Sequence, residues 1–155
     1  MVTENVRIVA VQASNLHDAA RIHSRSWQDA HRAFCNPEFV ALHTPERQEK
    51  YLRQKTADGS ALYILLGPEP IGIVSVKNSC IEDLYVLPEQ QNKGYGSMLL
   101  QFAIKTCPNT PTLWILENNT RARKLYERFG FRETGGRKQV THGLDEIEFA
   151  LLKCE

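Results

Sequence analysis

The chain has 155 residues, of which 42% are hydrophobic and 24% are charged. This length predicts a single domain, residues 1–155, that builds a hydrophobic core without metal or disulfide staples. Nineteen basic and 18 acidic side chains leave a net charge of +1, which argues against a protein that coats nucleic acid. The sequence has no apolar run of the roughly 20 residues that cross a bilayer, and no signal-peptide pattern. We therefore expect a soluble cytoplasmic domain with neither a membrane nor a nucleic-acid partner.

The N-terminal segment predicts a strand followed by a helix. The β-branched run Val6–Val11 is typical of a strand. Ser14 or Asn15 then caps a helix whose apolar stripe extends to Phe34. His23 falls on this stripe, where it either faces a substrate cleft or is a structural histidine with satisfied hydrogen bonds.

The rest of the chain alternates short strands with helices. Thr44-Pro45-Glu46 combines an N-cap, a first-turn proline and an acid, and opens a polar surface helix that ends near Ala57. The further predicted strands are Ala61–Leu66, Ile71–Lys77, Cys80–Leu87, Thr112–Leu116 and Ile147–Leu151, and the further predicted helices are Gly94–Lys105 and Asn119–Gly130.

This order of elements predicts an α/β (α+β) fold. Strands that follow one another as hairpins are antiparallel, whereas strands joined through a helix can be parallel. We therefore expect a mixed, mostly antiparallel central sheet of six to seven strands, flanked by about four helices.

The turn before the Gly94 helix has the features of an anion site. Gly94 and Gly96 open an apolar helix directly after a polar loop, so unpaired N–H groups and the helix dipole face a common point. Lys93 adds a cation and Ser97 a hydroxyl donor. A dinucleotide fingerprint would need a small residue where Leu99 stands, and a P-loop would need Gly-Lys-Ser/Thr. The turn is therefore either a phosphate site of another type or a glycine-containing loop that binds no ligand.

Two motifs resemble the GNAT superfamily of acyl-CoA-dependent N-acetyltransferases. Gln91-x-x-Gly94-x-Gly96 is similar to its phosphate-binding motif, and Asn119-x-x-Ala122-x-x-Leu125-Tyr126-x-x-x-Gly130-Phe131 is similar to its second conserved helix. The two motifs stand in the order that the superfamily uses. The resemblance implies the superfamily's fold and acetyl-CoA as the cosubstrate.

The resemblance also implies which residues hold the cosubstrate. The strand Leu84, Tyr85 and Val86 should part from its neighbour and offer backbone groups to the pantetheine arm. The residues implied for the pyrophosphate are Gln91, Asn92, Lys93, Gly94, Tyr95, Gly96 and Ser97. Asn119 either contacts coenzyme A or only caps its helix.

Tyr126 is the candidate general acid, because a phenol within reach of the thioester sulfur can protonate the departing thiolate. Its alternative role is a packed aromatic on an apolar helix stripe. Glu82 and Asp83 are the candidate general bases, with Glu82 slightly favoured. Strand alternation places these two carboxylates on opposite faces, so only one can point into the cleft. Either can instead be a solvated charge at a strand edge.

The residues between Arg121 and Lys138 include seven basic and two acidic side chains, a local charge of +5. This segment either attracts the phosphates of coenzyme A or is an ordinary solvated face.

Together these features predict direct transfer of acetyl from acetyl-CoA to a primary amine in a ternary complex. Neither a metal ion nor a covalent enzyme intermediate is needed, and the histidines and cysteines have no metal-site spacing. The alternative is a non-catalytic acyl-CoA-binding or sensing module. The acceptor, a small-molecule or peptide amine, is not specified by any motif, and Phe34–Thr44 is the segment expected to line its cleft. The resemblance also makes a homodimer possible.

Overall fold

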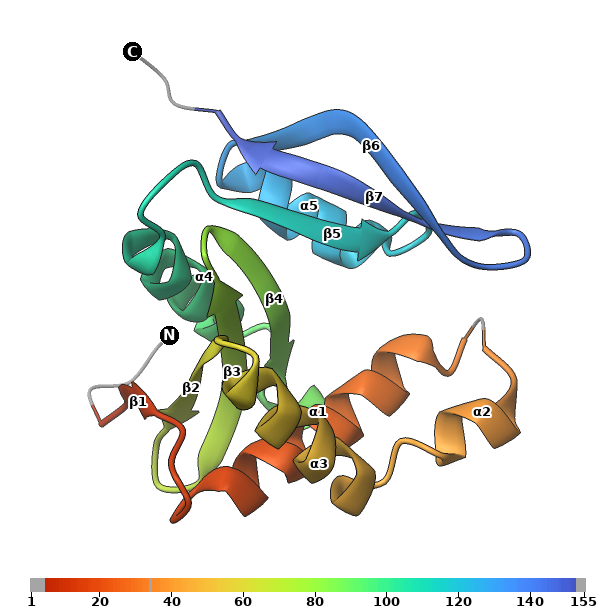
Figure 1. Cartoon of the computed structure of the whole chain (residues 1–155). Coiled ribbons are helices and arrows are strands. Elements are labelled where there is room, and N and C mark those ends of the chain that lie inside the picture. Colours follow the sequence, from red (N-terminus) through yellow and green to blue (C-terminus); the bar gives the residue numbers. More distant parts are fainter. Residues whose placement is uncertain (1–4, 34, 153–155) are drawn as a thin grey trace.

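The computed structural model describes residues 5–33 and 35–152, and its centre is one sheet of seven strands (Figure 1). The strand order is β1-β2-β3-β4-β5-β7-β6, in which β4 and β5 run parallel and the other neighbours run antiparallel. The strands are β1 (Arg7–Ala10), β2 (Ala61–Leu66), β3 (Pro70–Lys77), β4 (Cys80–Val86), β5 (Thr112–Leu116), β6 (Phe131–Thr141) and β7 (Leu144–Leu151).

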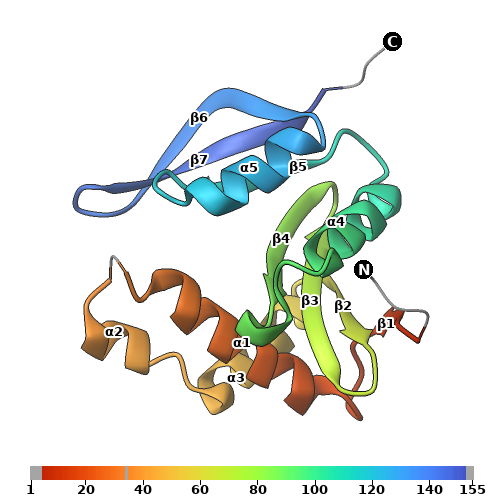
Figure 2. The same ribbon diagram turned by 180° about the vertical axis from the view of Figure 1, so that it is seen from behind.

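Helices cover both faces of the sheet. They are α1 (Leu16–His31), α2 (Pro37–Ala41), α3 (Pro45–Ala57), α4 (Tyr95–Thr106) and α5 (Thr120–Arg128), with a single 3₁₀ turn, η1 (Pro88–Gln90). The α1 and α3 helices pack together on one face, whereas α4 and α5, in front in Figure 2, belong to the core on the other face. None of the helices in the described part of the chain has the length and hydropathy to cross a membrane.

The mixed, mostly antiparallel sheet predicted from the sequence is confirmed, but the chain has one more helix than expected. The additional helix, α2, lies within the segment expected to line the acceptor cleft; Phe34, the first residue of that segment, lies outside the described residues. The polar helix α3 lies at the surface as expected, with only Gln48 and Leu52 of its residues buried. One side of α3 is buried against α1, with Leu52 fully buried and Gln48 only 3% exposed.

Strand β3, which lies between β2 and β4, is buried on both of its faces. Ile73 packs with Ala20, Ile22 and Leu52 on the α1–α3 side. Val74 packs on the α4 side, in a core cluster with Leu99, Leu100 and Ala103. A strand covered on both faces becomes a continuous apolar run rather than an alternating one, as Ile71–Val76 does around Gly72 and Ser75.

A glycine lets α4 approach this strand closely. At Gly72, a Cβ atom would lie 2.7 Å from the carbonyl oxygen of Tyr85 and 2.9 Å from Cδ1 of Leu99. The Tyr85 backbone of β4 and the Leu99 side chain of α4 therefore occupy the space that any larger residue at position 72 would need.

Strand β4 is irregular and soon leaves its parallel neighbour. Its ladder with β5 has two residue pairs, Cys80↔Thr112 and Ile81↔Leu113, after which the two strands diverge (Figure 1). On its other side, the register with β3 skips Val74, so that Asp83 and Leu84 both stand opposite this residue as a bulge. Asp83 has a positive φ of 40°.

We expect Gly72→Ala to lower the free energy of unfolding by about 1–3 kcal/mol, because the new methyl group overpacks the contact between β3, β4 and α4. Urea denaturation of the ligand-free protein measures this change. The matched control is Gly96→Ala, where a Cβ would meet its nearest neighbour at an ordinary 3.7 Å. Equal stabilities of the two variants would contradict the proposed crowding at Gly72.

Candidate active site

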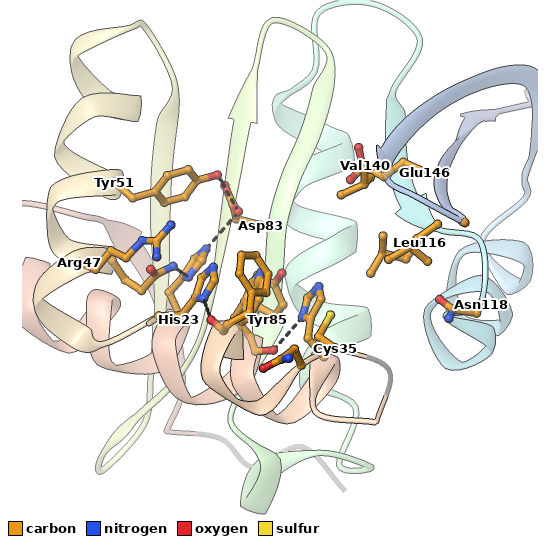
Figure 3. A pocket seen from close by; sticks show the side chains of 18 of the residues that line it. His23, Cys35, Arg47, Tyr51, Asp83, Tyr85, Leu116, Asn118, Val140 and Glu146 are labelled. Atoms are coloured by element: carbon orange, nitrogen blue, oxygen red, sulfur yellow. Dashed lines mark hydrogen bonds and ion pairs between the residues drawn. The ribbon is translucent and has the colours of Figure 1, made fainter. Parts of the chain in front are cut away.

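A cavity of about 890 Å³ lies between the three N-terminal helices and the tip of the β6–β7 hairpin. Its volume is in the range of ligand pockets. The segment between α1 and α3 lines it as expected, through Cys35, Asn36, Phe39 and His43. Figure 3 shows Tyr51, His23 and Asp83 on one side, with Leu116, Val140 and Glu146 across from them.

The carboxylate of Asp83 is the most heavily bonded group at this cavity. It lies 2.8 Å from Nζ of Lys55 and 3.2 Å from Nε2 of His23. The Tyr51 hydroxyl donates to it at 3.1 Å and the Ser75 hydroxyl at 3.0 Å. Burial alone would raise the pKa of Asp83, but the hydrogen bonds and charges of His23 and Lys55 outweigh it and hold the pKa well below its ordinary value.

His23 is fixed by bonds at both of its ring nitrogens. Nε2 faces Asp83, and Nδ1 lies 2.7 Å from the side-chain amide nitrogen of Gln48. With that amide as the donor, Nδ1 accepts and the imidazole hydrogen points to Asp83. His23 is therefore a structural histidine with both ring nitrogens bonded, and although it is only 2% exposed it also lines the cavity.

The two candidate bases are not on opposite sides of β4. Nζ of Lys55 lies 2.7 Å from Glu82 and 2.8 Å from Asp83, so both carboxylates reach the same cation. The expected alternation is wrong here because the bulge and the positive φ of Asp83 interrupt the pleat. Of the two residues, Asp83 lines the cavity.

We expect the contribution of Asp83 to stability to depend on pH. Because its folded-state pKa is depressed, this contribution is present above the unfolded-state pKa of about 4 and is lost as the pH falls below it. Asp83→Asn should lower the free energy of unfolding by about 1–3 kcal/mol at pH 7, and by less at pH 3. Urea denaturation at both pH values measures the difference.

The control for this experiment is Glu69→Gln, which removes an exposed carboxylate in the β2–β3 turn. It should leave the unfolding free energy close to that of the wild type at both pH values. If Asp83→Asn lowered the free energy of unfolding equally at pH 7 and pH 3, the carboxylate charge would not be what stabilises the fold.

The loop before α4 presents a row of unbonded backbone amides. Within the described residues, the N–H groups of Asn92, Lys93, Gly94, Tyr95, Gly96 and Ser97 have no acceptor. Gly94 is the N-cap with a φ of 89°, and Asn92 also has a positive φ, 64°. The Gln91 side chain donates to the carbonyl of Val86 at 3.0 Å, which ties this loop to the end of β4. The arrangement suits an anion.

The structure brings the two sequence motifs side by side. The Arg121 guanidinium donates to Oδ1 of Asn92 at 3.1 Å and so joins the start of α5 to the loop before α4. Asn119 caps α5, since its Oδ1 accepts from the N–H of Ala122 at 3.1 Å, while its amide nitrogen points to no acceptor among the described residues. Lys93 reaches Oε1 of Gln90, and the Tyr95 side chain is buried in the core.

Tyr126 is a core residue that packs in the cluster on the α4 side of the sheet. It is 7% exposed and packs against Phe131 with 5.9 Å between ring centroids. Burial raises the pKa of Tyr126 above its ordinary value, so its phenol stays protonated. Burial, and after it the charge of Asp83, raise the pKa of Tyr85, which lines the cavity.

Ion pairs reduce the local positive charge between Arg121 and Lys138. Arg123 contacts Glu133 at 3.0 Å, and Arg137 contacts Glu117 and Asp145. Lys138 lies 4.0 Å from the ring centroid of Trp114. Arg121 is the member of this basic segment that reaches the amide loop.

A sequence profile described as the acetyltransferase (GNAT) family matches residues 19–131 of the chain. This span contains most of α1, the bulged strand β4, the amide loop and the Tyr126 helix α5. The chain belongs to the GNAT family. It is therefore an acetyl-CoA-dependent N-acetyltransferase.

Individual proteins agree with this assignment. The chain is 27% identical to the probable N-acetyltransferase Rv2775 of Mycobacterium tuberculosis over 87% of its own length and 84% of that protein. It has the fold of apo YjaB from Escherichia coli, with a TM-score of 0.73 and 21% identity, and the match covers 99% of this chain and 100% of YjaB. It also has the fold of a spermidine N-acetyltransferase from Vibrio cholerae in complex with CoA and spermine, with a TM-score of 0.68, 17% identity and 95% coverage of both chains.

The cosubstrate of this GNAT enzyme is acetyl-CoA. No cluster of three or more metal-ligating side chains occurs among residues 5–33 and 35–152. The sequence did not single out Lys55, Tyr51 or Gln48 as site residues. The spacing of these three residues puts them on one side of α3, but the sequence alone does not show that this side of the helix faces β4.

Proposed function

We propose that this enzyme transfers acetyl directly to a primary amine in a ternary complex, with Tyr126 as the general acid. The observation that carries the proposal is the parting of β4 from β5 directly beside the unbonded amide loop. It leaves the β5-facing edge of β4 without ladder partners after Ile81, next to the amide loop, and Asp83 and Tyr85 of the same strand line the cavity.

The residues present fit coenzyme A. The amides of residues 92–97 and the Arg121 guanidinium suit its phosphates. The edge of β4 at Leu84, Tyr85 and Val86 lacks ladder partners on β5 and suits the amide groups of a pantetheine arm. Asn119 has a side-chain amide group left for the same ligand once its oxygen has capped α5.

Acetyl-CoA supplies the acetyl group as a thioester, so a C–N bond to the amine forms and the C–S bond breaks. In our proposal Tyr126 donates its phenolic proton to the departing sulfur and recovers a proton from solvent afterwards. The cavity, whose wall holds Tyr85 and Asp83, positions the amine at the gap between β4 and β5.

The amine must also lose a proton, and Asp83 is poorly suited to accept it. A carboxylate with a strongly depressed pKa is a weak base, and its oxygens already receive four donors. We propose that Asp83 orients Tyr51 and His23 and that Glu82 helps to hold Lys55. The proton of the amine then leaves through water in the cavity.

Tyr126→Phe should lower kcat by about a hundredfold or more, the usual contribution of a general acid, with little change in CoA affinity. Steady-state thiol release and calorimetric CoA titration measure the two quantities. Tyr63→Phe is the control, since Tyr63 packs on Phe102 away from the cavity. Full turnover by folded Tyr126→Phe would refute the general-acid role.

CoA binding by the wild type with no thiol release on any amine would instead favour a sensing module.

Gly94→Ala should weaken CoA binding by about tenfold or more, because an L-residue at a φ of 89° is strained and shifts the amide loop. The matched control is Gly59→Ala, which creates the same backbone strain at a φ of 101°, with no atom within 4 Å of the new Cβ. Calorimetry should find normal CoA affinity in this control. If Gly94→Ala and Gly59→Ala bound CoA with equal affinity, the loop before α4 would not be the binding site of the cosubstrate.

A further inference from the structure

One wall of the cavity is a stack of three rings. The Trp27 indole lies nearly parallel to the imidazole of His31, at 3.9 Å between centroids, and to that of His43, at 3.5 Å. Two rings this close to one indole must lie on its opposite faces. Phe39 then packs edge-on against both Trp27 and His43, at 5.8 and 5.0 Å. All four side chains line the cavity.

Hydrogen bonds hold this ring wall in place, and burial favours its uncharged form. Nδ1 of His31 bonds the carbonyl of Trp27 at 2.7 Å, and Nδ1 of His43 bonds the carbonyl of Phe39 at 3.0 Å. Burial lowers the pKa of both imidazoles, which favours their neutral forms at pH 7. The wall is thus a pre-organised apolar surface rather than a cationic one.

Two of the exposed side chains that line the cavity are also apolar. Phe39 is 47% exposed and Val140, on the β6–β7 hairpin, is 53% exposed. Exposed hydrophobic side chains in the lining of a cavity are typical of ligand-binding surfaces.

The charges of the cavity do not suit a polycation. Its described lining has two carboxylates, Asp83 and Glu146, and one guanidinium, that of Arg47. Asp83 is already neutralised by Lys55 and bonded by Tyr51, Ser75 and His23. Glu146 is thus the one lining carboxylate for a substrate ammonium group, whereas a polyamine carries several. Aromatic rings, by contrast, find a matching surface here.

Resting on the proposed function, we propose that the acceptor is a primary amine carried on a flat aromatic ring. The ring lies against Phe39 and the Trp27 stack, and a short arm carries the amine toward Tyr85 and the gap beside β4. Phe39 is then a specificity-determining residue, because it is the exposed ring of the wall.

The test compares 2-phenylethylamine with 2-cyclohexylethylamine, which has the same length but is neither flat nor aromatic. Spermidine and a lysine-containing peptide are the competing acceptors. Thiol release from acetyl-CoA should give 2-phenylethylamine the highest kcat/KM, at least about threefold above its cyclohexyl analogue. A higher kcat/KM for spermidine or the peptide, or equal values for the two ring amines, overturns the acceptor class while leaving acetyl transfer intact.

Phe39→Ala should raise the KM for 2-phenylethylamine about three- to tenfold and remove the preference over the cyclohexyl amine. Leu42→Ala is the matched control. Leu42 is the C-cap of the same helix and is 56% exposed, but it does not line the cavity. In Leu42→Ala, the KM values for 2-phenylethylamine and 2-cyclohexylethylamine should both stay at their wild-type levels. A ring preference that survives in Phe39→Ala contradicts the assignment of Phe39.

A further measurement separates failure of this inference from failure of the proposed function. If no amine supports thiol release, acetyl transfer fails, but the ring wall is still tested by calorimetric titration of CoA-loaded protein with both ring amines. Tighter binding of 2-phenylethylamine, lost in Phe39→Ala, supports an aromatic ligand. Equal binding of the two amines overturns it.

Discussion

The separation of β4 from β5 is the constraint on which the rest of the site depends. Two parallel neighbours normally continue their ladder, yet here it stops after Ile81↔Leu113. The free edge that results would be a liability on an open sheet. In this enzyme it lies beside the amide loop that begins α4 and faces the interior of the molecule, so a ligand can take the place of the missing strand.

The bulge at Asp83 couples this separation to the N-terminal helices. A regular β4 would direct Glu82 and Asp83 to opposite faces, whereas the bulge lets both meet Lys55 of α3. Asp83 in turn holds Tyr51 and His23, one from each helix of the α1–α3 pair. One irregular residue thus fixes the α1–α3 wall of the cavity to strand β4, at the cost of a positive φ.

Local chemistry explains which parts of the structure could be predicted from the sequence. Three local patterns each predicted one element, and the structure confirms all three elements. They are the Thr44 cap of α3, the Gly94 cap of α4, and the buried Ile147 and Phe149 that alternate along β7. The helix α2 is one turn long with few apolar contacts, although Asn36-Pro37-Glu38 repeats the cap signature of α3. The bulge, the Lys55 contacts and the ring wall depend on tertiary packing between distant segments, which no local pattern records.

The strand order has a consequence for how the molecule folds. β7 follows β6 in the sequence but lies between β5 and β6, so β6 joins the sheet only through β7. Its own sequence is polar and has two adjacent glycines, which gives it little strand propensity of its own. The half of the sheet beyond β5 therefore depends on the β6–β7 hairpin, because β6 pairs with no strand but β7 among the described residues. The same hairpin supplies Val140, Leu144 and Glu146 to the cavity, so the cavity wall is complete only when these distant segments have paired.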